Sequence, residues 1–126
     1  MTDATLHPAF ASGNTAVITG AASGIGLAAA KCFAQLGLNV VLADLGSDRL
    51  NEAAREVAKL SPRGSDAIAA IPTDVSFLAD IEVLADDAAA RFGAVHVVMN
   101  NAGIQPGSAL FGPLENWERV LAVNLW

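Results

Sequence analysis

Four short aliphatic runs recur along the chain at nearly even intervals, and segments with helical periodicity separate them. The runs occupy residues 15–19, 39–43, 67–71 and 95–99. Strands that alternate with helices in this way indicate right-handed βαβ units and a parallel sheet. Hydrophobic residues make up 53% of the 126-residue chain, as expected for a sheet whose strands are covered on both faces. The alternation therefore predicts an α/β fold.

Three helices are predicted between these runs, and a fourth begins at Pro113, whose fixed φ suits the first helical position. The predicted apolar face of the first helix is Ile25, Ala28, Ala29, Cys32, Phe33 and Leu36. That of the second is Leu50, Ala53, Ala54, Val57 and Leu60. That of the third is Phe77, Ile81, Leu84, Ala85, Ala88 and Phe92. Residues 1–14 are predicted as an N-terminal arm and residues 15–126 as one domain.

The first predicted strand meets the first predicted helix in residues 19–26, which are almost all glycine, alanine and serine. Phosphate oxygens reach backbone N–H groups only where side chains leave room, and the positive end of the helix dipole then faces the anion. Gly20 allows the tight turn, Gly24 lets the backbone approach a pyrophosphate, and Gly26 lets the helix pack closely on the strand. The turn predicts a dinucleotide-binding site. The alternative is a tight connection without a ligand.

Asp44 follows the second predicted strand, 18 residues after Gly26. Dinucleotide sites place an acidic residue about 20 residues beyond the glycine turn, where it accepts hydrogen bonds from the adenosine ribose. We therefore expect Asp44 to bind the ribose of the cofactor. The alternatives are an aspartate in a solvated loop, or a cap for the helix that starts near Ser47.

The same carboxylate favours NAD over NADP, because it would repel a 2′-phosphate. A site for NADP offers a basic residue nearby, but Ser23 and Leu45 occupy the two positions where we expect one. The nearest candidate, Arg49, lies inside the next predicted helix. NAD is therefore the predicted cofactor.

Charge and hydropathy exclude several classes of partner. The formal net charge is −6, so no basic surface is expected to bind nucleic acid. No apolar run approaches the roughly 20 residues that span a bilayer. Because the first 14 residues lack the basic and apolar pattern of a signal peptide, we expect a cytoplasmic protein that binds no membrane.

The histidines and the single cysteine indicate no metal site. Cys32 is the only cysteine, so neither an internal disulfide nor a multi-cysteine metal cluster can form. His7 and His96 have no partners at metal-ligand spacing and are predicted to be structural. Arg63 is predicted to be a solvated surface charge.

Four motifs together resemble the short-chain dehydrogenase/reductase family. Residues 19–26 match its glycine turn, Thr-Gly-x-x-x-Gly-x-Gly, including a spacing that differs from the general dinucleotide fingerprint. Asp74-Val75 follows the third predicted strand, Asn100-Asn101-Ala102-Gly103 follows the fourth, and Val123-Asn124-Leu125 lies on the fourth helix. The resemblance implies a Rossmann-type, doubly wound parallel sheet. Its N-terminal half would hold four strands in the order 3-2-1-4.

The resemblance also implies contacts to the cofactor. The glycine turn would surround the pyrophosphate, with Ser23 and Ile25 adding contacts. Asp74 and Val75 would border the adenine, where the aspartate accepts a hydrogen bond from an amino group. The alternative is a capping role, in which Asp74 or Ser76 starts the third helix.

Two asparagines complete the implied site. Asn101 would lie against the ribose, and Asn124 corresponds to the asparagine of the family's catalytic set, which holds a water in the proton-relay path. The alternative for Asn100 and Asn101 is a structural role that fastens strand ends. For Asn124 it is a helix asparagine without catalytic function.

The family's catalytic tyrosine and lysine are not among these residues, since the chain contains no tyrosine. The predicted strand at 95–99 would also form an open, nearly uncharged sheet edge, which needs a neighbour. We therefore expect an incomplete, truncated domain that is inactive alone and forms a homo-oligomer.

Two functions follow from these observations. The first is an NAD-dependent oxidoreductase that transfers hydride between nicotinamide and a small-molecule secondary alcohol or ketone. The second is a catalytically incomplete dinucleotide-binding module without turnover.

Overall fold

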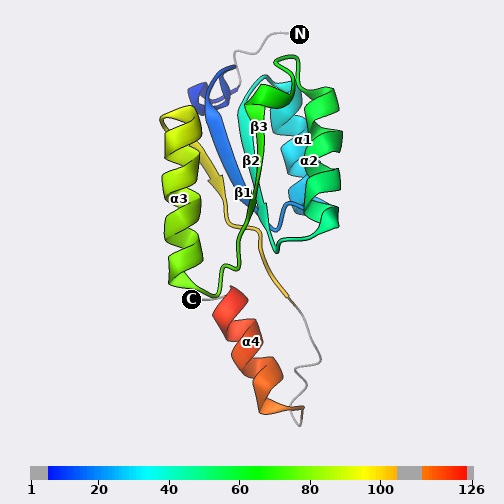
Figure 1. Ribbon diagram of the computed structural model, residues 1–126, viewed down its shortest axis with the longest axis vertical. Coiled ribbons are helices and arrows are strands. Elements are labelled where there is room, and N and C mark those ends of the chain that lie inside the picture. Colours follow the sequence, from blue (N-terminus) through cyan, green and yellow to red (C-terminus); the bar gives the residue numbers. More distant parts are fainter. Residues whose placement is uncertain (1–5, 105–111, 125–126) are drawn as a thin grey trace.

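The computed structural model describes residues 6–104 and 112–124. Its centre is a four-stranded, all-parallel sheet of β1 (Thr15–Thr19), β2 (Asn39–Asp44), β3 (Ile68–Pro72) and β4 (Val97–Met99). The strand order is β3-β2-β1-β4 (Figure 1). The predicted order and the Rossmann-type class are therefore confirmed.

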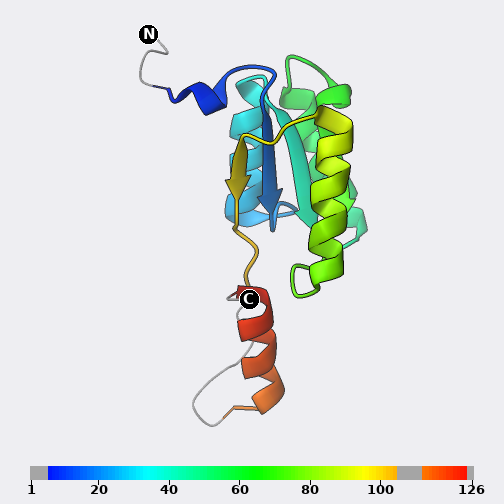
Figure 2. The same ribbon diagram turned by 90° about the vertical axis from the view of Figure 1, so that its left-hand side faces the viewer.

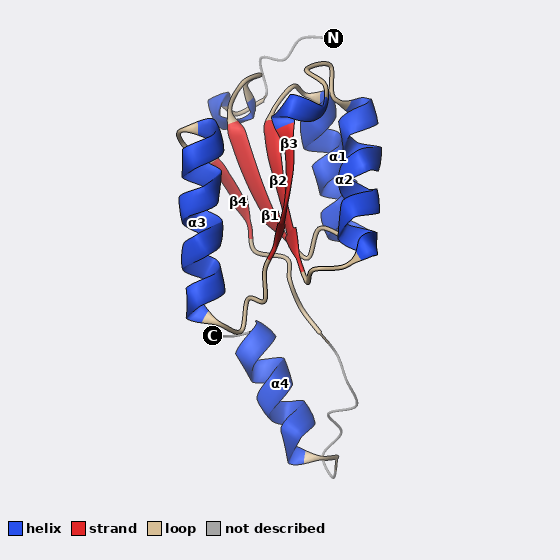
Figure 3. Ribbon diagram, viewed as in Figure 1, coloured by secondary structure: helices blue, strands red, loops and turns tan. Residues whose placement is uncertain are grey.

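Helices cover both faces of this sheet (Figure 3). One face carries α1 (Gly24–Gln35) and α2 (Asp48–Leu60), and the other carries α3 (Leu78–Phe92). The fourth helix, α4 (Leu114–Asn124), lies beyond the carboxyl ends of the strands (Figure 2). No helix among the described residues is long and apolar enough to cross a membrane.

The core consists of two apolar clusters, one on each face of the sheet. The cluster beneath α1 and α2 includes the fully buried Ile18, Leu42 and Leu50. The cluster beneath α3 includes Val41 and Leu84. Successive strand residues point to opposite faces, so β2 supplies both clusters from adjacent positions. The two central strands are thus held from both sides, and they carry the turns that form the site.

The predicted apolar face of α1 is wrong for most of its members. The helix buries Gly26, Ala30 and Ala34 against the sheet, while Ile25 is 73% exposed and Cys32 is also exposed. A close approach to the sheet requires small residues on the buried face, which leaves larger apolar side chains at its flanks. In a helix this rich in alanine, hydrophobic periodicity does not distinguish the two faces.

The third helix and the strands before and after it also differ in detail from the prediction. Of the six apolar residues predicted for its face, only Leu84 and Ala88 are buried, and Phe77 lies before the helix with 61% of its surface exposed. The predicted third strand is shifted by one residue because a short 3-10 turn, η2 (Ser65–Ala67), precedes it. The predicted fourth strand shortens to Val97–Met99.

His96 explains why that strand is shorter than its apolar run. Its backbone N–H donates to the carbonyl oxygen of Thr15 at 2.9 Å, and its Nδ1 accepts from the Thr15 N–H at 3.0 Å. The imidazole therefore takes the place of a backbone acceptor at the start of β1. His7 similarly accepts from the Ala9 N–H through Nδ1. Both histidines are structural, as predicted.

Residues 6–14 are attached to the domain rather than separate from it. They contain a 3-10 turn, η1 (Pro8–Phe10), and Phe10 stacks on Phe33 of α1 with ring centroids 5.7 Å apart. The Gly13 N–H donates to the carbonyl oxygen of Gly37 at 2.9 Å. The boundary at residue 14 stays a prediction.

A buried polar network joins this segment to the sheet. The Asn39 Nδ2 donates to the Gly13 carbonyl oxygen at 3.1 Å and to Thr15 Oγ1 at 3.2 Å. Asn39 Oδ1 accepts from the Arg63 guanidinium at 2.6 Å. Arg63 is exposed, as predicted for a solvated charge, and its pairing with a buried amide was not predicted.

We predict that Asn39→Ala lowers the free energy of unfolding by about 2–3 kcal/mol, because it leaves buried polar partners unsatisfied. Urea unfolding measures the change. The control is Asn51→Ala on the exposed surface of α2, with an expected effect of at most about 0.5 kcal/mol. Equal effects of the two substitutions would contradict the importance of the network.

Candidate functional site

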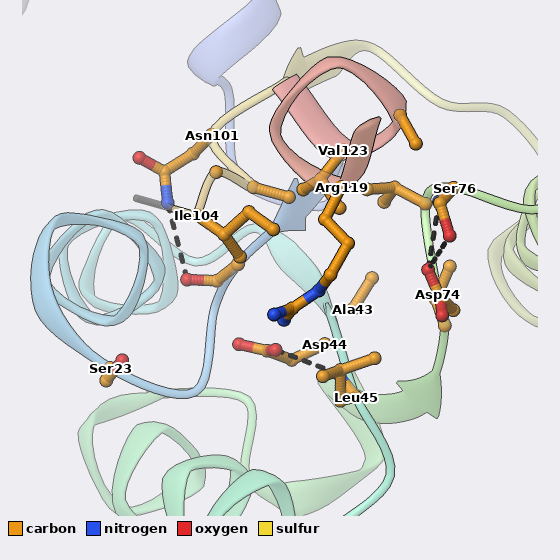
Figure 4. Close-up of a pocket in the computed structure, with 16 residues that line it drawn as sticks. Ser23, Ala43, Asp44, Leu45, Asp74, Ser76, Asn101, Ile104, Arg119 and Val123 are labelled. Atoms are coloured by element: carbon orange, nitrogen blue, oxygen red, sulfur yellow. Dashed lines mark hydrogen bonds between the residues drawn. The ribbon is translucent and has the colours of Figure 1, made fainter. Parts of the chain in front are cut away.

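The carboxyl ends of the four strands open into a cavity of about 410 Å³. Its walls come from the glycine turn, the end of β2 with Leu45, residues 73–76 after β3, residues 101–104 and α4 (Figure 4). Parallel strands place their carboxyl ends at one edge of the sheet, so residues far apart in sequence meet there. Most of the predicted site residues line this cavity: Gly20, Ser23, Asp44, Asp74, Val75 and Asn101.

The three glycines of the turn differ in what surrounds them. A Cβ on Gly26 would lie 2.3 Å from the Gly20 carbonyl oxygen, and one on Gly20 would lie 2.9 Å from Asn101 Nδ2. These two glycines are required by packing within the protein. A Cβ on Gly24 would meet no atom within 4 Å, although the residue has a positive φ of +57°. The space in front of Gly24 therefore remains accessible to a ligand.

The start of α1 also offers hydrogen-bond donors to that space. Its N-cap, Ser23, makes no side-chain capping bond. In α2, by contrast, the side chain of Ser47 accepts from the Leu50 N–H. Ser23, Gly24 and Ile25 are all exposed. First-turn N–H groups have no acceptor within their own helix, so this end of α1 can bind an anion.

Asp44 is held rigidly at the edge of the cavity. Its Oδ2 accepts from the Ala22 N–H at 2.9 Å, and its Oδ1 accepts from the Leu45 N–H at 2.8 Å. The carboxylate thus fastens the glycine turn to the end of β2 and retains lone pairs for a ligand. Its alternative role as a cap of α2 is wrong, because Ser47 caps that helix.

Asp74 orders the turn that precedes α3. Its Oδ1 accepts from both the backbone N–H and the hydroxyl of Ser76, and its own N–H donates to Asp80 Oδ2 at 2.8 Å. The N-cap position of the helix belongs to Phe77, which makes no side-chain capping bond. Neither Asp74 nor Ser76 is therefore the N-cap, and both border the cavity with Val75.

Asn101 fastens β4 to the glycine turn. Its Nδ2 donates to the carbonyl oxygens of Thr19 at 3.2 Å and Gly20 at 3.3 Å. The N–H groups of Asn101 and Ala102 both donate to Thr19 Oγ1 at 3.0 Å. The structural role considered for this asparagine is present, and the side chain also lines the cavity.

Asn124 connects α4 to the segment after β4. Its Oδ1 accepts from the Ile104 N–H at 2.8 Å, and its Nδ2 donates to the Ile104 carbonyl oxygen at 2.9 Å. The amide thereby imitates the backbone of a neighbouring strand. This pairing, which positions α4 beside the cavity, was not predicted, and the catalytic role of Asn124 stays a prediction.

Arg119, which was not predicted as a site residue, also lines the cavity, from α4. Figure 4 shows its side chain directed across the cavity toward Asp44. Arg119 and Val123 are four residues apart on one helix and therefore share a face. Because Val123 belongs to the predicted Val123-Asn124 motif, this four-residue spacing was the sequence signal from which Arg119 could have been predicted.

A model of the short-chain dehydrogenase family matches residues 14–126. The chain belongs to the short-chain dehydrogenase/reductase family. This assignment agrees with the motif order and with the observed strand order.

Curated members of the family show the same relationship. The chain is 43% identical over 114 residues to a 1-deoxy-11-beta-hydroxypentalenate dehydrogenase from Streptomyces exfoliatus, covering 88% of this chain and 40% of that protein. It is 41% identical over 113 residues to a D-beta-hydroxybutyrate dehydrogenase from Rhizobium meliloti, covering 88% of this chain and 43% of that protein. The chain therefore spans less than half the length of these relatives.

Solved structures of short-chain dehydrogenases superpose on the chain. A Caenorhabditis elegans member with cofactor matches with a TM-score of 0.84 at 28% identity, over 92% of this chain and 44% of that chain. A 3-ketoacyl-(acyl-carrier-protein) reductase from Brucella melitensis complexed with NADH matches with a TM-score of 0.79 at 36% identity, over 90% and 45%. Such neighbours indicate a nicotinamide dinucleotide cofactor for the family.

We predict that two alanine substitutions in the glycine turn of this chain differ in their effect on stability. Gly26→Ala forces the helix away from the Gly20 carbonyl and should cost about 2–3 kcal/mol of unfolding free energy. Gly24→Ala meets no neighbouring atom and should cost about 1–2 kcal/mol, the strain of its positive φ. Urea unfolding of both variants measures the difference. A larger loss for Gly24→Ala than for Gly26→Ala would contradict the packing argument.

Proposed function

We propose that this chain binds NAD and forms the cofactor site of an oxidoreductase that transfers hydride between nicotinamide and a secondary alcohol or ketone. The observation that carries the proposal is the fixed position of Asp44. Its carboxylate lies at the cavity edge, held by the Ala22 and Leu45 N–H groups, beside the exposed start of α1. An acceptor for ribose hydroxyls and donors for phosphate are thus adjacent.

The glycine turn fits the pyrophosphate of a dinucleotide. Apart from the chain neighbours of Gly24 and the nearby backbone of its own helix, no atom lies within 4 Å of a Cβ built at that glycine. The first turn of α1 supplies N–H groups and the positive end of the helix dipole. Ser23 and Ile25 flank this space and are exposed. We assign the pyrophosphate to this turn.

The ribose and the adenine would occupy the neighbouring part of the cavity. Asp44 would accept hydrogen bonds from the ribose hydroxyls. Asp74 keeps one carboxylate oxygen free of bonds to Ser76, so it can accept from the adenine amino group beside Val75. Asn101 would adjoin the second ribose while it holds the turn in place.

The preference for NAD follows from charge at the ribose. Ser23 and Leu45 are uncharged, and Arg49 does not line the cavity that contains Asp44. Arg49 borders a smaller cavity with Ser23 and Gly24, on the side of the assigned pyrophosphate. The fixed carboxylate of Asp44 would repel a 2′-phosphate, and its rigid attachment prevents it from turning away. We therefore propose NAD rather than NADP.

When bound, NAD supplies a hydride acceptor at the nicotinamide ring. The residues of this chain would bind and orient the dinucleotide, and Asn124 would be the member of the catalytic set that this chain contributes.

The alternative function, a dinucleotide-binding module without turnover, is favoured by one observation: none of the 126 residues is a tyrosine. A small-molecule alcohol or ketone, a homo-oligomeric state and a cytoplasmic location stay predictions for the whole protein.

We predict that Asp44→Ala raises the Kd for NAD about tenfold, because hydrogen bonds to a charged acceptor are lost. The preference for NAD over NADP should fall by a similar factor. Calorimetric titration with both cofactors measures the two constants. Their ratio, taken on one sample, does not depend on the fraction of folded protein.

The control for this substitution is Asp86→Ala, which removes the same charge from the exposed surface of α3. It should leave both constants within about twofold. If Asp44→Ala leaves the ratio of the two constants unchanged, the role assigned to Asp44 is wrong.

We also predict that the 126-residue chain binds NAD without reducing it in the presence of secondary alcohols. The family's proton-transferring tyrosine and its lysine partner are not among its residues, and such groups contribute about 10²–10⁴-fold to a rate. Binding is followed by calorimetry and turnover by the absorbance of reduced nicotinamide. Turnover by the chain alone would contradict the expectation that it is inactive without this tyrosine and lysine.

A further inference from the structure

The charged side chains around the cavity differ in sign and in how firmly they are held. Two carboxylates line it, those of Asp44 and Asp74, and both are held by hydrogen bonds to the loops that carry them. Arg119 is the one cationic side chain among the described residues of the lining. An anion bound in this cavity therefore meets a single full positive charge.

Arg119 is free to contact a ligand. It is exposed, and it forms no hydrogen bond or ion pair with another described residue. Its side chain extends from α4 across the cavity and ends near Asp44 in the view of Figure 4. Asp44 and Arg119 line the same cavity, so a ligand bound against Asp44 would face the guanidinium.

We propose that Arg119 is a residue that determines cofactor selectivity, because its guanidinium attracts the 2′-phosphate that Asp44 repels. The inference rests on the proposed binding of the adenosine ribose at Asp44. A planar guanidinium binds a phosphate through two parallel N–H donors, whereas it gains much less from a neutral ribose hydroxyl. Its effect is therefore specific to the phosphorylated cofactor.

The balance between the two charges sets the direction of selectivity. Asp44 is half-buried and fixed by two backbone N–H groups, whereas Arg119 is exposed and must give up side-chain entropy to bind. The repulsion of a 2′-phosphate by Asp44 is therefore stronger than its attraction by Arg119. NAD remains the preferred cofactor, but Arg119 makes the preference smaller. Without Arg119 the site rejects NADP more strongly.

Calorimetric titration of the 126-residue chain with NAD and NADP tests the inference. Arg119→Gln should raise the Kd for NADP about five- to tenfold and change the Kd for NAD less than about twofold. Arg119→Lys keeps the charge but loses the two parallel donors, so it should raise the Kd for NADP by about two- to threefold, less than Arg119→Gln does. Since the guanidinium is exposed, the effect of Arg119→Gln should shrink as salt rises from about 0.05 to 0.5 M.

The control is Arg91→Gln, which removes an equal charge from the last turn of α3, at the end of the sheet remote from α4 (Figure 1). It should change neither constant by more than about twofold. The inference is overturned if Arg119→Gln changes the Kd for NAD and the Kd for NADP by the same factor, or if it changes neither. Failure of the unsubstituted chain to bind either cofactor would instead overturn the proposed function, so the two failures are distinguishable.

Discussion

The site depends on one close contact, between the start of α1 and the end of β1. The absence of a side chain at Gly26 lets the helix backbone touch the Gly20 carbonyl, and the Asn101 amide closes the same contact from β4. Three elements therefore meet within van der Waals distance at the point where the sheet ends. A single added methyl group would separate them and displace the residues that line this side of the cavity.

The polar residues around the cavity are likewise held in place by contacts within the protein. Asp44, Asp74 and Asn101 each bond to the backbone of the loop that carries them or that lies next to it. Each side chain is thereby oriented before any ligand arrives, which lowers the entropic cost of binding. Asn101 holds the glycine turn and also lines the cavity, so its structural role is compatible with the binding role proposed for it.

The sequence predicted the elements and their order because apolar runs and glycine turns are local signals. It also located Asp44, since the spacing from a glycine turn is a property of one βαβ unit. The buried face of α1 was not predictable, because small residues lie on every side of this helix and the close approach that selects Gly26, Ala30 and Ala34 is tertiary. Arg119 and the pairing of Arg63 with Asn39 were missed for a similar reason: their partners are distant in sequence, and no local pattern distinguishes them from solvated charges.

The reciprocal pair between Asn124 and Ile104 has a consequence for the whole of α4. Two hydrogen bonds to one residue fix an angle as well as a distance, so they set the rotational phase of the helix about its own axis. Neighbouring helix residues differ by about 100° in direction. A rotation of that size would present the carboxylate of Glu118 to the cavity instead of the guanidinium of Arg119. The amide at the end of the helix thus determines the sign of the charge that faces the cavity more than a turn away.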